Sequence, residues 1–161
     1  MAAKVESTVV IARPVEEVFG FVLDAEANMP RWNAAVESVA KTSEGPIGTG
    51  STFQMRGQMM GRRLAMTARL TTVEPNRQIE MEAAGRPIAP RAGFWFEQED
   101  GGTRVTFRGD PNPVGVLKLL SPLVARQAQR LWDGNLARLK TEVEGSAPSG
   151  PSGPSGVAPT S

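Results

Sequence analysis

The side chains that most often carry acid–base, nucleophilic and metal chemistry are missing from this sequence. Its 161 residues include no histidine, no cysteine and no tyrosine, which removes imidazole bases, thiolate nucleophiles, disulfides and phenol acids together. A general acid or base near neutral pH would have to be a carboxylate whose pKa is raised by burial, or a lysine. A metal would have to be held by carboxylates and amides, so no metal and no cofactor is predicted.

Three charged residues are placed best for chemistry, but each has a local explanation. Asp24 is expected to cap a short helix, Asp110 precedes a proline between a strand and a helix, and Arg108 alternates onto the solvent face of its strand. Acid–base catalysis requires a carboxylate held in a dry pocket. The periodicity places no pair of carboxylates on the apolar face, so binding without catalysis is favoured.

Asn135 is the polar residue singled out by its position. It projects to the centre of the apolar stripe of the last predicted helix, one turn from Leu131 and Leu139. A buried amide needs partners, which are either a sheet carbonyl or ordered water, the favoured interpretation, or a carbonyl or hydroxyl of a ligand. Trp32, next to Asn33, is expected mainly to pack, with contact to a ligand as the alternative.

A sheet is predicted to position these residues. Val5 to Ile11 is rich in β-branched residues, and a period of two then predicts strands at about 36–42, 51–59, 62–73, 78–84, 92–99 and 103–109. Each strand has one apolar and one polar face, as in an antiparallel sheet with one solvent face. The apolar face supplies the predicted ligand contacts Phe53, Met55, Met66, Met81, Phe94, Phe96 and Phe107. Trp95 falls on the polar face, where it is expected to cover the stems of arginines.

Helices are predicted to cover the apolar face. One begins at Arg13-Pro14, and a second short turn from Ala25 to Asn28 ends at Pro30. The last helix is expected to begin near residue 113, to bend or restart near 122 and to end at about Glu144. Its apolar stripe comprises Leu117, Leu120, Val124, Ala128, Leu131, Trp132, Leu139 and Val143. The helix is predicted to contribute Leu120, Val124, Leu131 and Asn135 to ligand binding.

Six strings occur in a distinctive order. They are RPVEEVFGFVLDAEANMPRWN (13–33), GPIGTGSTF (45–53), Gly61 at a hairpin tip followed by two arginines, VEPNRQIEME (73–82), GGTRVTF (101–107) and SPLVARQAQRLWDGNLARLK (121–140). Together they resemble the START-related (SRPBCC) superfamily, in its bacterial polyketide cyclase/dehydratase-like branch. The resemblance implies an α+β helix-grip fold, in which a curved seven-stranded antiparallel sheet, two short helices and a long C-terminal helix enclose a cavity. Its members include lipid carriers, quinone-binding proteins, aromatase/cyclases and chaperone-associated domains.

The composition is that of a single globular domain. Apolar residues make up 40%, charged residues 22%, and the net charge is +1, so no strongly basic field exists and nucleic acid is not an expected partner. No stretch suits a signal peptide or a membrane span, which predicts a cytoplasmic protein without stable membrane insertion. Residues 1–145 are predicted to form the domain, and residues 146–161, SAPSGPSGPSGVAPTS, a disordered tail.

The favoured hypothesis for function is binding or carriage of a hydrophobic small molecule, such as a lipid, a polyketide or a quinone, in an internal apolar cavity. It follows from the uniformly apolar face of the predicted sheet, together with the cavity that the resemblance implies. A metal-free polyketide cyclase or dehydratase is the first alternative and rests on the resemblance alone. A protein-interaction module that uses the polar face around Trp95 is the second, and no particular protein partner is predicted.

Overall fold

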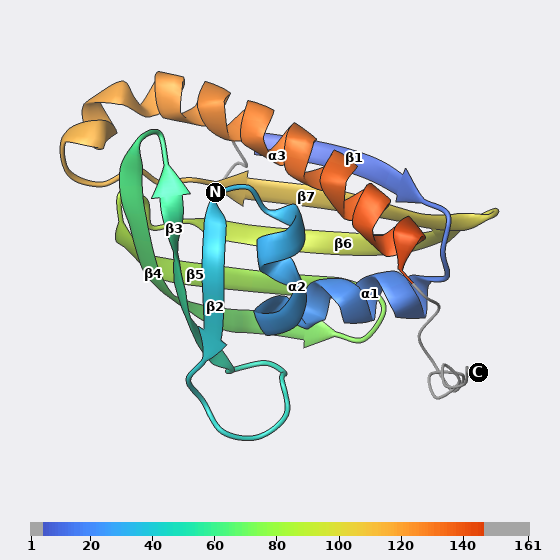
Figure 1. Ribbon diagram of the computed structural model, residues 1–161. Coiled ribbons are helices and arrows are strands. Elements are labelled where there is room, and N and C mark those ends of the chain that lie inside the picture. The colour runs from blue at the N-terminus through green and yellow to red at the C-terminus, as the bar shows by residue number, and fades with distance from the viewer. Residues whose placement is uncertain (1–4, 147–161) are drawn as a thin grey trace, which may run out of the picture.

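A strongly curved antiparallel sheet wraps around a long helix in the computed structural model, which describes residues 5–146 (Figure 1). The elements are β1 (Val5–Ile11), α1 (Val15–Leu23), α2 (Ala25–Trp32), β2 (Val36–Lys41), β3 (Thr52–Met59), β4 (Arg62–Glu74), β5 (Gln78–Arg86), β6 (Arg91–Glu99), β7 (Gly102–Asp110), the 3₁₀ helix η1 (Gly115–Leu120) and α3 (Ser121–Gly145). The sheet order is β1-β7-β6-β5-β4-β3-β2. The predicted helix-grip architecture is confirmed, and each predicted strand begins and ends within two residues of an observed one.

Alternation along the strands creates the apolar concave face. In β4, Leu64, Met66, Ala68 and Leu70 are buried, and the residues between them are exposed. The tip of the β3–β4 hairpin is the two-residue turn Met60-Gly61, whose φ angles are 52° and 74°, as the right-handed twist of paired strands favours. The buried residues of neighbouring strands therefore face α1, α2 and α3.

Gly57 marks the place where β3 passes closest to the segment that leads into β2. A Cβ atom at this position would lie 1.8 Å from the backbone oxygen of Ala35, and the neighbouring Gln58 N–H donates to that same oxygen at 2.9 Å. The pairing of β2 with β3 shifts register between Val36 and Ser38. Only a residue without a side chain fits here, because backbone fills the space that a Cβ would need.

The two short helices follow the prediction in order but not in detail. The second one, α2, runs from Ala25 to Trp32, so the prediction that Pro30 ends it is wrong. Because the helix is short, Pro30 removes only one hydrogen bond near the end of α2. The helical hydrogen-bond pattern resumes where Asn33 N–H donates to Met29 O at 2.8 Å. Asp24 precedes this helix, but its side chain makes no capping hydrogen bond, contrary to expectation.

The restart of the last helix near residue 122 is confirmed, because η1 ends at Leu120 and α3 begins at Ser121. The prediction that Leu120 faces the interior is wrong, since its exposed fraction is 46%. A 3₁₀ helix has three residues per turn rather than 3.6, so a projection at 100° per residue loses phase across η1. Leu117 and Val124, on either side of the junction, are buried as predicted.

Side chains of α3 satisfy the free edge of β1, which pairs with β7 on its other side. Gln129 accepts from Glu6 N–H at 3.2 Å and donates to Glu6 O at 2.8 Å. Lys140 donates to Val10 O at 3.0 Å, and Glu144 accepts from Ala12 N–H at 2.7 Å. The bond from Ala12, followed by the one from Lys140, lowers the pKa of Glu144 below its usual value. The long helix is thus fastened to one strand along most of its length.

Within residues 5–146, no helix is long and apolar enough to cross a lipid bilayer. The tail predicted for residues 146–161 lies outside the described residues, apart from Ser146.

Candidate functional site: an apolar cavity

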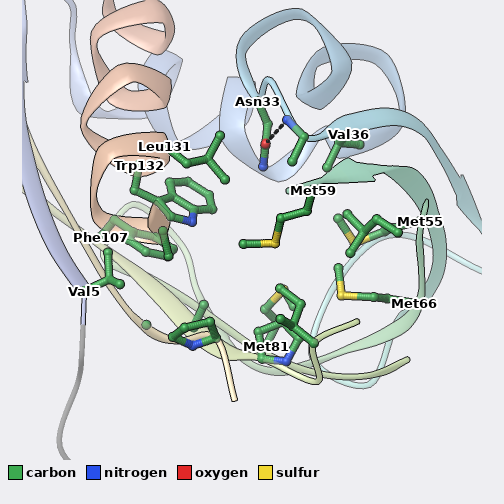
Figure 2. Close-up of a pocket in the computed structure, with 18 of the residues that line it drawn as sticks. Val5, Asn33, Val36, Met55, Met59, Met66, Met81, Phe107, Leu131 and Trp132 are labelled. Atoms are coloured by element: carbon green, nitrogen blue, oxygen red, sulfur yellow. Dashed lines mark hydrogen bonds between the residues drawn. The ribbon is translucent and has the colours of Figure 1, made fainter. Parts of the chain in front are cut away.

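An apolar cavity lies between the concave face of the sheet and α3, and Figure 2 shows the side chains around it. Its free volume is about 80 Å³, several times the roughly 10–15 Å³ that one water molecule requires. The residues that line it are Val5, Met29, Asn33, Ala35, Val36, Met55, Met59, Leu64, Met66, Met81, Ile88, Pro90, Arg91, Ala92, Phe94, Phe107, Gly109, Asp110, Pro111, Ala128, Leu131 and Trp132. We refer to it as the main cavity.

Methionine is concentrated in this wall. Five of the seven methionines of the chain line the main cavity, namely Met29, Met55, Met59, Met66 and Met81. In Figure 2, Met55 and Met66 lie on the side of the cavity that faces away from Trp132. The unbranched thioether adapts to irregular apolar shapes, so this side of the wall can change shape at small energetic cost.

A second apolar cavity of about 50 Å³ lies beneath α1 and α2. Met29, Met55, Met81 and Phe94 line both cavities and therefore form the partition between them. An apolar cavity of about 150 Å³ is sufficient for benzene, so either space alone holds only a small molecule. A ligand of greater length requires the partition to move, and three of its four side chains are flexible methionines.

The wall opposite the methionines is aromatic and rigid. The rings of Trp132 and Phe107 are stacked, with 3.7 Å between their centroids and an angle of 10° between their planes. Phe94 lies 5.8 Å from Trp132 and 5.2 Å from Phe107, in tilted or edge-on contacts. Trp32 packs edge-on against Phe94 and Trp132, each at 6.0 Å. Aromatic pairs in such geometries stabilise one another beyond the area that they bury, so this side of the cavity has a fixed shape.

Asn33 is the polar group that the structure directs toward the main cavity from the α2 side (Figure 2). Its Oδ1 accepts from Ala35 N–H at 3.0 Å and from Asn135 Nδ2 at 3.1 Å. Because these donors require an oxygen, they fix which way the amide is turned. The Nδ2 group of Asn33 is therefore presented to the cavity as a donor.

Arg91 and Asp110 are the two charged residues among those that line the main cavity. They are register partners on β6 and β7, and both also line a hollow on the outer face of the sheet. Asp110 is 7% exposed, and its carboxylate accepts from Asn112 N–H at 2.9 Å. The Asp110 carboxylate therefore serves the loop that follows β7, as expected, and the residue is also one of those that line the main cavity.

Asn135 is fully buried and does not line the main cavity. Its role is structural, as favoured, but its partners belong to the segment between α2 and β2 and are not the expected sheet carbonyl. Its Oδ1 accepts from Ala34 N–H at 3.0 Å, and its Nδ2 donates to Asn33. The amide thereby links α3 to the segment between α2 and β2. Its action on the cavity is indirect, because it holds Asn33.

We expect Asn135→Leu to lower the free energy of unfolding by about 2 kcal/mol, because it removes the acceptor of Ala34 N–H and one of the two donors to the buried Asn33 Oδ1. Denaturation in urea measures the change. The matched control is Gln127→Leu on the same helix, a half-buried residue, which should shift stability by less than about 0.5 kcal/mol. Unchanged stability of Asn135→Leu would contradict the structural role.

The structure divides the twelve predicted ligand contacts into two groups. Six line the main cavity: Met55, Met66, Met81, Phe94, Phe107 and Leu131. Of the others, Phe53 lines the second cavity, while Trp32, Phe96, Val124 and Asn135 are buried in the core outside both walls, and Leu120 is exposed. Phe96 packs edge-on against Phe19 at 5.3 Å. Trp32 is fully buried, and its Nε1 has no hydrogen-bond partner among the described residues.

Sequence reasoning missed several wall residues for identifiable reasons. Ala128 and Trp132 were assigned to the apolar stripe of the last helix, and Met59 and Leu64 follow the alternation of their strands, but none of the four was selected as a contact. Val5 gave no such signal, because the antiparallel pairing of the first and last strands brings it to the cavity. Ile88, Pro90 and Pro111 lie in connections, where periodicity carries no information.

The outer face of the sheet follows its prediction. Arg108 is exposed and pairs with Glu6 at 3.4 Å. Its guanidinium carbon lies 5.5 Å from the centroid of the Trp95 ring, so the expected cover of arginine by Trp95 is confirmed. The ring also lies over Gly93, where a Cβ would approach it to 2.6 Å. In the part of the chain from residue 5 to 146, no group of three or more metal-ligating side chains is found.

A long helix held in the concave face of a curved antiparallel sheet, with an apolar cavity between them, defines the helix-grip class of the START-related superfamily. Residues 2–144 match the family model described as polyketide cyclase / dehydrase and lipid transport, and the chain belongs to that family. No curated protein matches the chain in sequence.

Solved structures share the fold at low sequence identity. A protein of Thermus thermophilus is 20% identical with a TM-score of 0.74, the alignment covering 86% of this chain and 95% of that one. A START superfamily protein of Mycobacterium smegmatis is 19% identical with a TM-score of 0.73, covering 87% and 96%. The ZhuI aromatase/cyclase of Streptomyces sp. R1128 is 16% identical with a TM-score of 0.70, covering 87% and 92%. At these identities the similarity concerns the fold alone.

Proposed function

We propose that this protein binds and carries a hydrophobic small molecule in the main cavity. The observation that carries the proposal is the cavity itself, whose wall is formed almost wholly by apolar side chains of the sheet and α3. Such walls, with a few placed polar groups, are typical of ligand sites. Membership of a family described by lipid transport and polyketide chemistry supports the same conclusion.

The ligand is expected to be mainly apolar, with an oxygen atom near one side. The Asn33 amide would donate to a carbonyl or hydroxyl oxygen, while the stacked Trp132 and Phe107 rings would form a flat wall beside the ligand. Lipids, quinones and aromatic polyketides fit this description. A ligand larger than the main cavity would displace Met29, Met55 and Met81 and extend into the second cavity.

Binding should be saturable and should occupy a single site. Titration with the apolar fluorophore N-phenylnaphthylamine is expected to give enhanced, blue-shifted emission, and a naphthoquinone should displace the dye in competition. Native mass spectrometry of freshly purified protein should show a noncovalently bound molecule or a one-to-one adduct with an added quinone. The proposal would be rejected if the protein showed no dye binding and formed no adduct when dye and quinone were present at concentrations well above that of the protein.

A second candidate function is a cyclase or dehydratase, and it is favoured by the presence of a buried acidic residue, Asp110, among the residues that line the cavity. Asp110 is the acidic residue among those that line the main cavity, and Arg91 is its register partner on β6. Incubation with a panel of reactive polyketide thioesters separates the two functions. If the protein converts a thioester and the Asp110→Asn variant does not, the function is enzymatic. If the protein binds a thioester and leaves it unchanged, the result supports the carrier function.

A further inference from the structure

One end of the molecule exposes a group of large apolar side chains. Their exposed fractions are 67% for Val116, 85% for Leu119, 46% for Leu120 and 41% for Leu123 on η1 and α3, and 38% for Met60 at the β3–β4 hairpin tip. We call these five residues the apolar ridge. Among residues 5–146, Val10 is the remaining large apolar residue with comparable exposure. Val116 and Leu119 are three residues apart and therefore share one face of the 3₁₀ helix η1, while Leu120 ends η1 and Leu123 lies in the first turn of α3.

Basic residues surround this ridge. Arg62 and Arg63 follow Met60, and both line a groove together with Arg86 and η1. Lys118 belongs to η1, and Arg126 and Arg130 lie in the first turns of α3. All six are exposed. We call Arg62, Arg63, Arg86, Lys118, Arg126 and Arg130 the basic collar.

The collar has few acidic neighbours along the chain, and the nearest one is Asp133, three residues after Arg130 on α3. The segments that supply it, residues 45–73, 83–96 and 111–132, contain no aspartate and no glutamate. The six ion pairs found among the described residues all use other basic residues. A net charge of +1 for the whole chain therefore conceals a local concentration of positive charge.

The ridge and the collar lie next to the wall of the main cavity. Met60, Arg63 and Arg130 are chain neighbours of the wall residues Met59, Leu64 and Leu131 respectively. The start of η1 is fastened to the end of β5, because Val114 N–H donates to Pro87 O at 3.0 Å. In Figure 1 the hairpin tip and the start of α3 occupy the same end of the molecule.

We propose that the apolar ridge and the basic collar dock this protein on the surface of an anionic phospholipid membrane, with this end of the main cavity toward the bilayer. The proposal rests on the proposed function, since a bilayer is the reservoir of a hydrophobic ligand. Apolar side chains that project from a helix enter the boundary between headgroups and acyl chains. Arginines around them pair with lipid phosphates, and each basic residue strengthens attachment to an anionic surface. The structure offers both features on one end.

Cosedimentation of the full chain with vesicles tests the proposal. Vesicles of phosphatidylcholine and phosphatidylglycerol in a two-to-one ratio should bind the protein at least about tenfold more strongly than phosphatidylcholine alone, and added salt should weaken binding. The variants Arg62→Gln/Arg63→Gln and Val116→Ser/Leu119→Ser should each weaken it by roughly tenfold or more. The matched controls, Arg56→Gln/Arg77→Gln and Val10→Ser, replace exposed residues of the same types elsewhere and should bind as the parent does.

Three results would overturn the docking proposal. They are the absence of vesicle binding, equal binding to both kinds of vesicle, and equal weakening by the control variants. Light scattering after gel filtration can give one more result that overturns the proposal. If the parent protein is a dimer and Leu119→Ser is a monomer, a second copy of the chain covers the apolar ridge. Dye binding without vesicles, measured on the same variants, should stay unchanged. If the parent protein does not bind the dye at all, the proposed function is refuted. Failure of the docking proposal and failure of the proposed function are therefore distinguishable.

Discussion

Ala128→Phe is expected to abolish binding of N-phenylnaphthylamine to a protein that still folds. Ala128 lies on α3, is 2% exposed and lines the main cavity. A phenyl ring at this position would occupy the free space of about 80 Å³. We expect affinity for the dye to fall by at least about tenfold, which corresponds to about 1.4 kcal/mol. Fluorescence titration measures the loss.

The control for this variant is Ala137→Phe, which introduces the same side chain on the exposed side of the same helix. It should bind the dye as the parent does. Thermal unfolding shows whether a loss of dye binding is caused by unfolding. Overpacking a filled core costs about 1–3 kcal/mol of stability, whereas filling an empty space costs less. A folded Ala128→Phe protein with undiminished affinity would show that the dye does not occupy the main cavity.

Gly57→Ala is expected to destabilise the protein by about 3 kcal/mol or more. The new Cβ would lie 1.8 Å from the Ala35 oxygen, so β3 and the segment before β2 must separate. That separation breaks the bond from Gln58 N–H to Ala35 O and disturbs Asn33, which receives Ala35 N–H. Urea denaturation should therefore show a lower transition midpoint, and dye binding should weaken in parallel.

Gly134→Ala is the matched control for that variant. Gly134 lies inside α3, and nothing lies within 4 Å of an added Cβ. Alanine is a better helix former than glycine by up to about 1 kcal/mol, so this change should stabilise the protein. If both variants had the same effect, the close approach at Gly57 would not limit stability.

The fold could be predicted from the sequence because the periodic segments agree with one another. The strands alternate cleanly, as Leu64 to Leu70 illustrate, and prolines mark the starts of α1 and of the restarted α3. Each strand buries one face, so a shift by one residue would expose its whole apolar set. The resemblance to a known superfamily then supplied the curvature, which no local pattern contains.

The site could be predicted only in part, because a cavity is defined by what fails to fill it. Burial separates Val124 and Phe96 from the solvent just as it does Met66 and Phe107, yet only the last two reach the main cavity. That difference depends on the distance between α3 and the strands. The orientation of the Asn33 amide could not be predicted for another reason, since one of its two donors is Asn135, 102 residues away.

The hydrogen bonds between α3 and β1 restrict how a ligand can reach the interior. If the helix lifted from the sheet, the backbone groups of Glu6, Val10 and Ala12 would lose the partners that Gln129, Lys140 and Glu144 provide. Such an opening would break four bonds at once and expose a bare strand edge to neighbouring molecules. A ligand should therefore enter the main cavity by displacing methionine side chains on the side of the cavity that lies away from β1, while α3 stays in place.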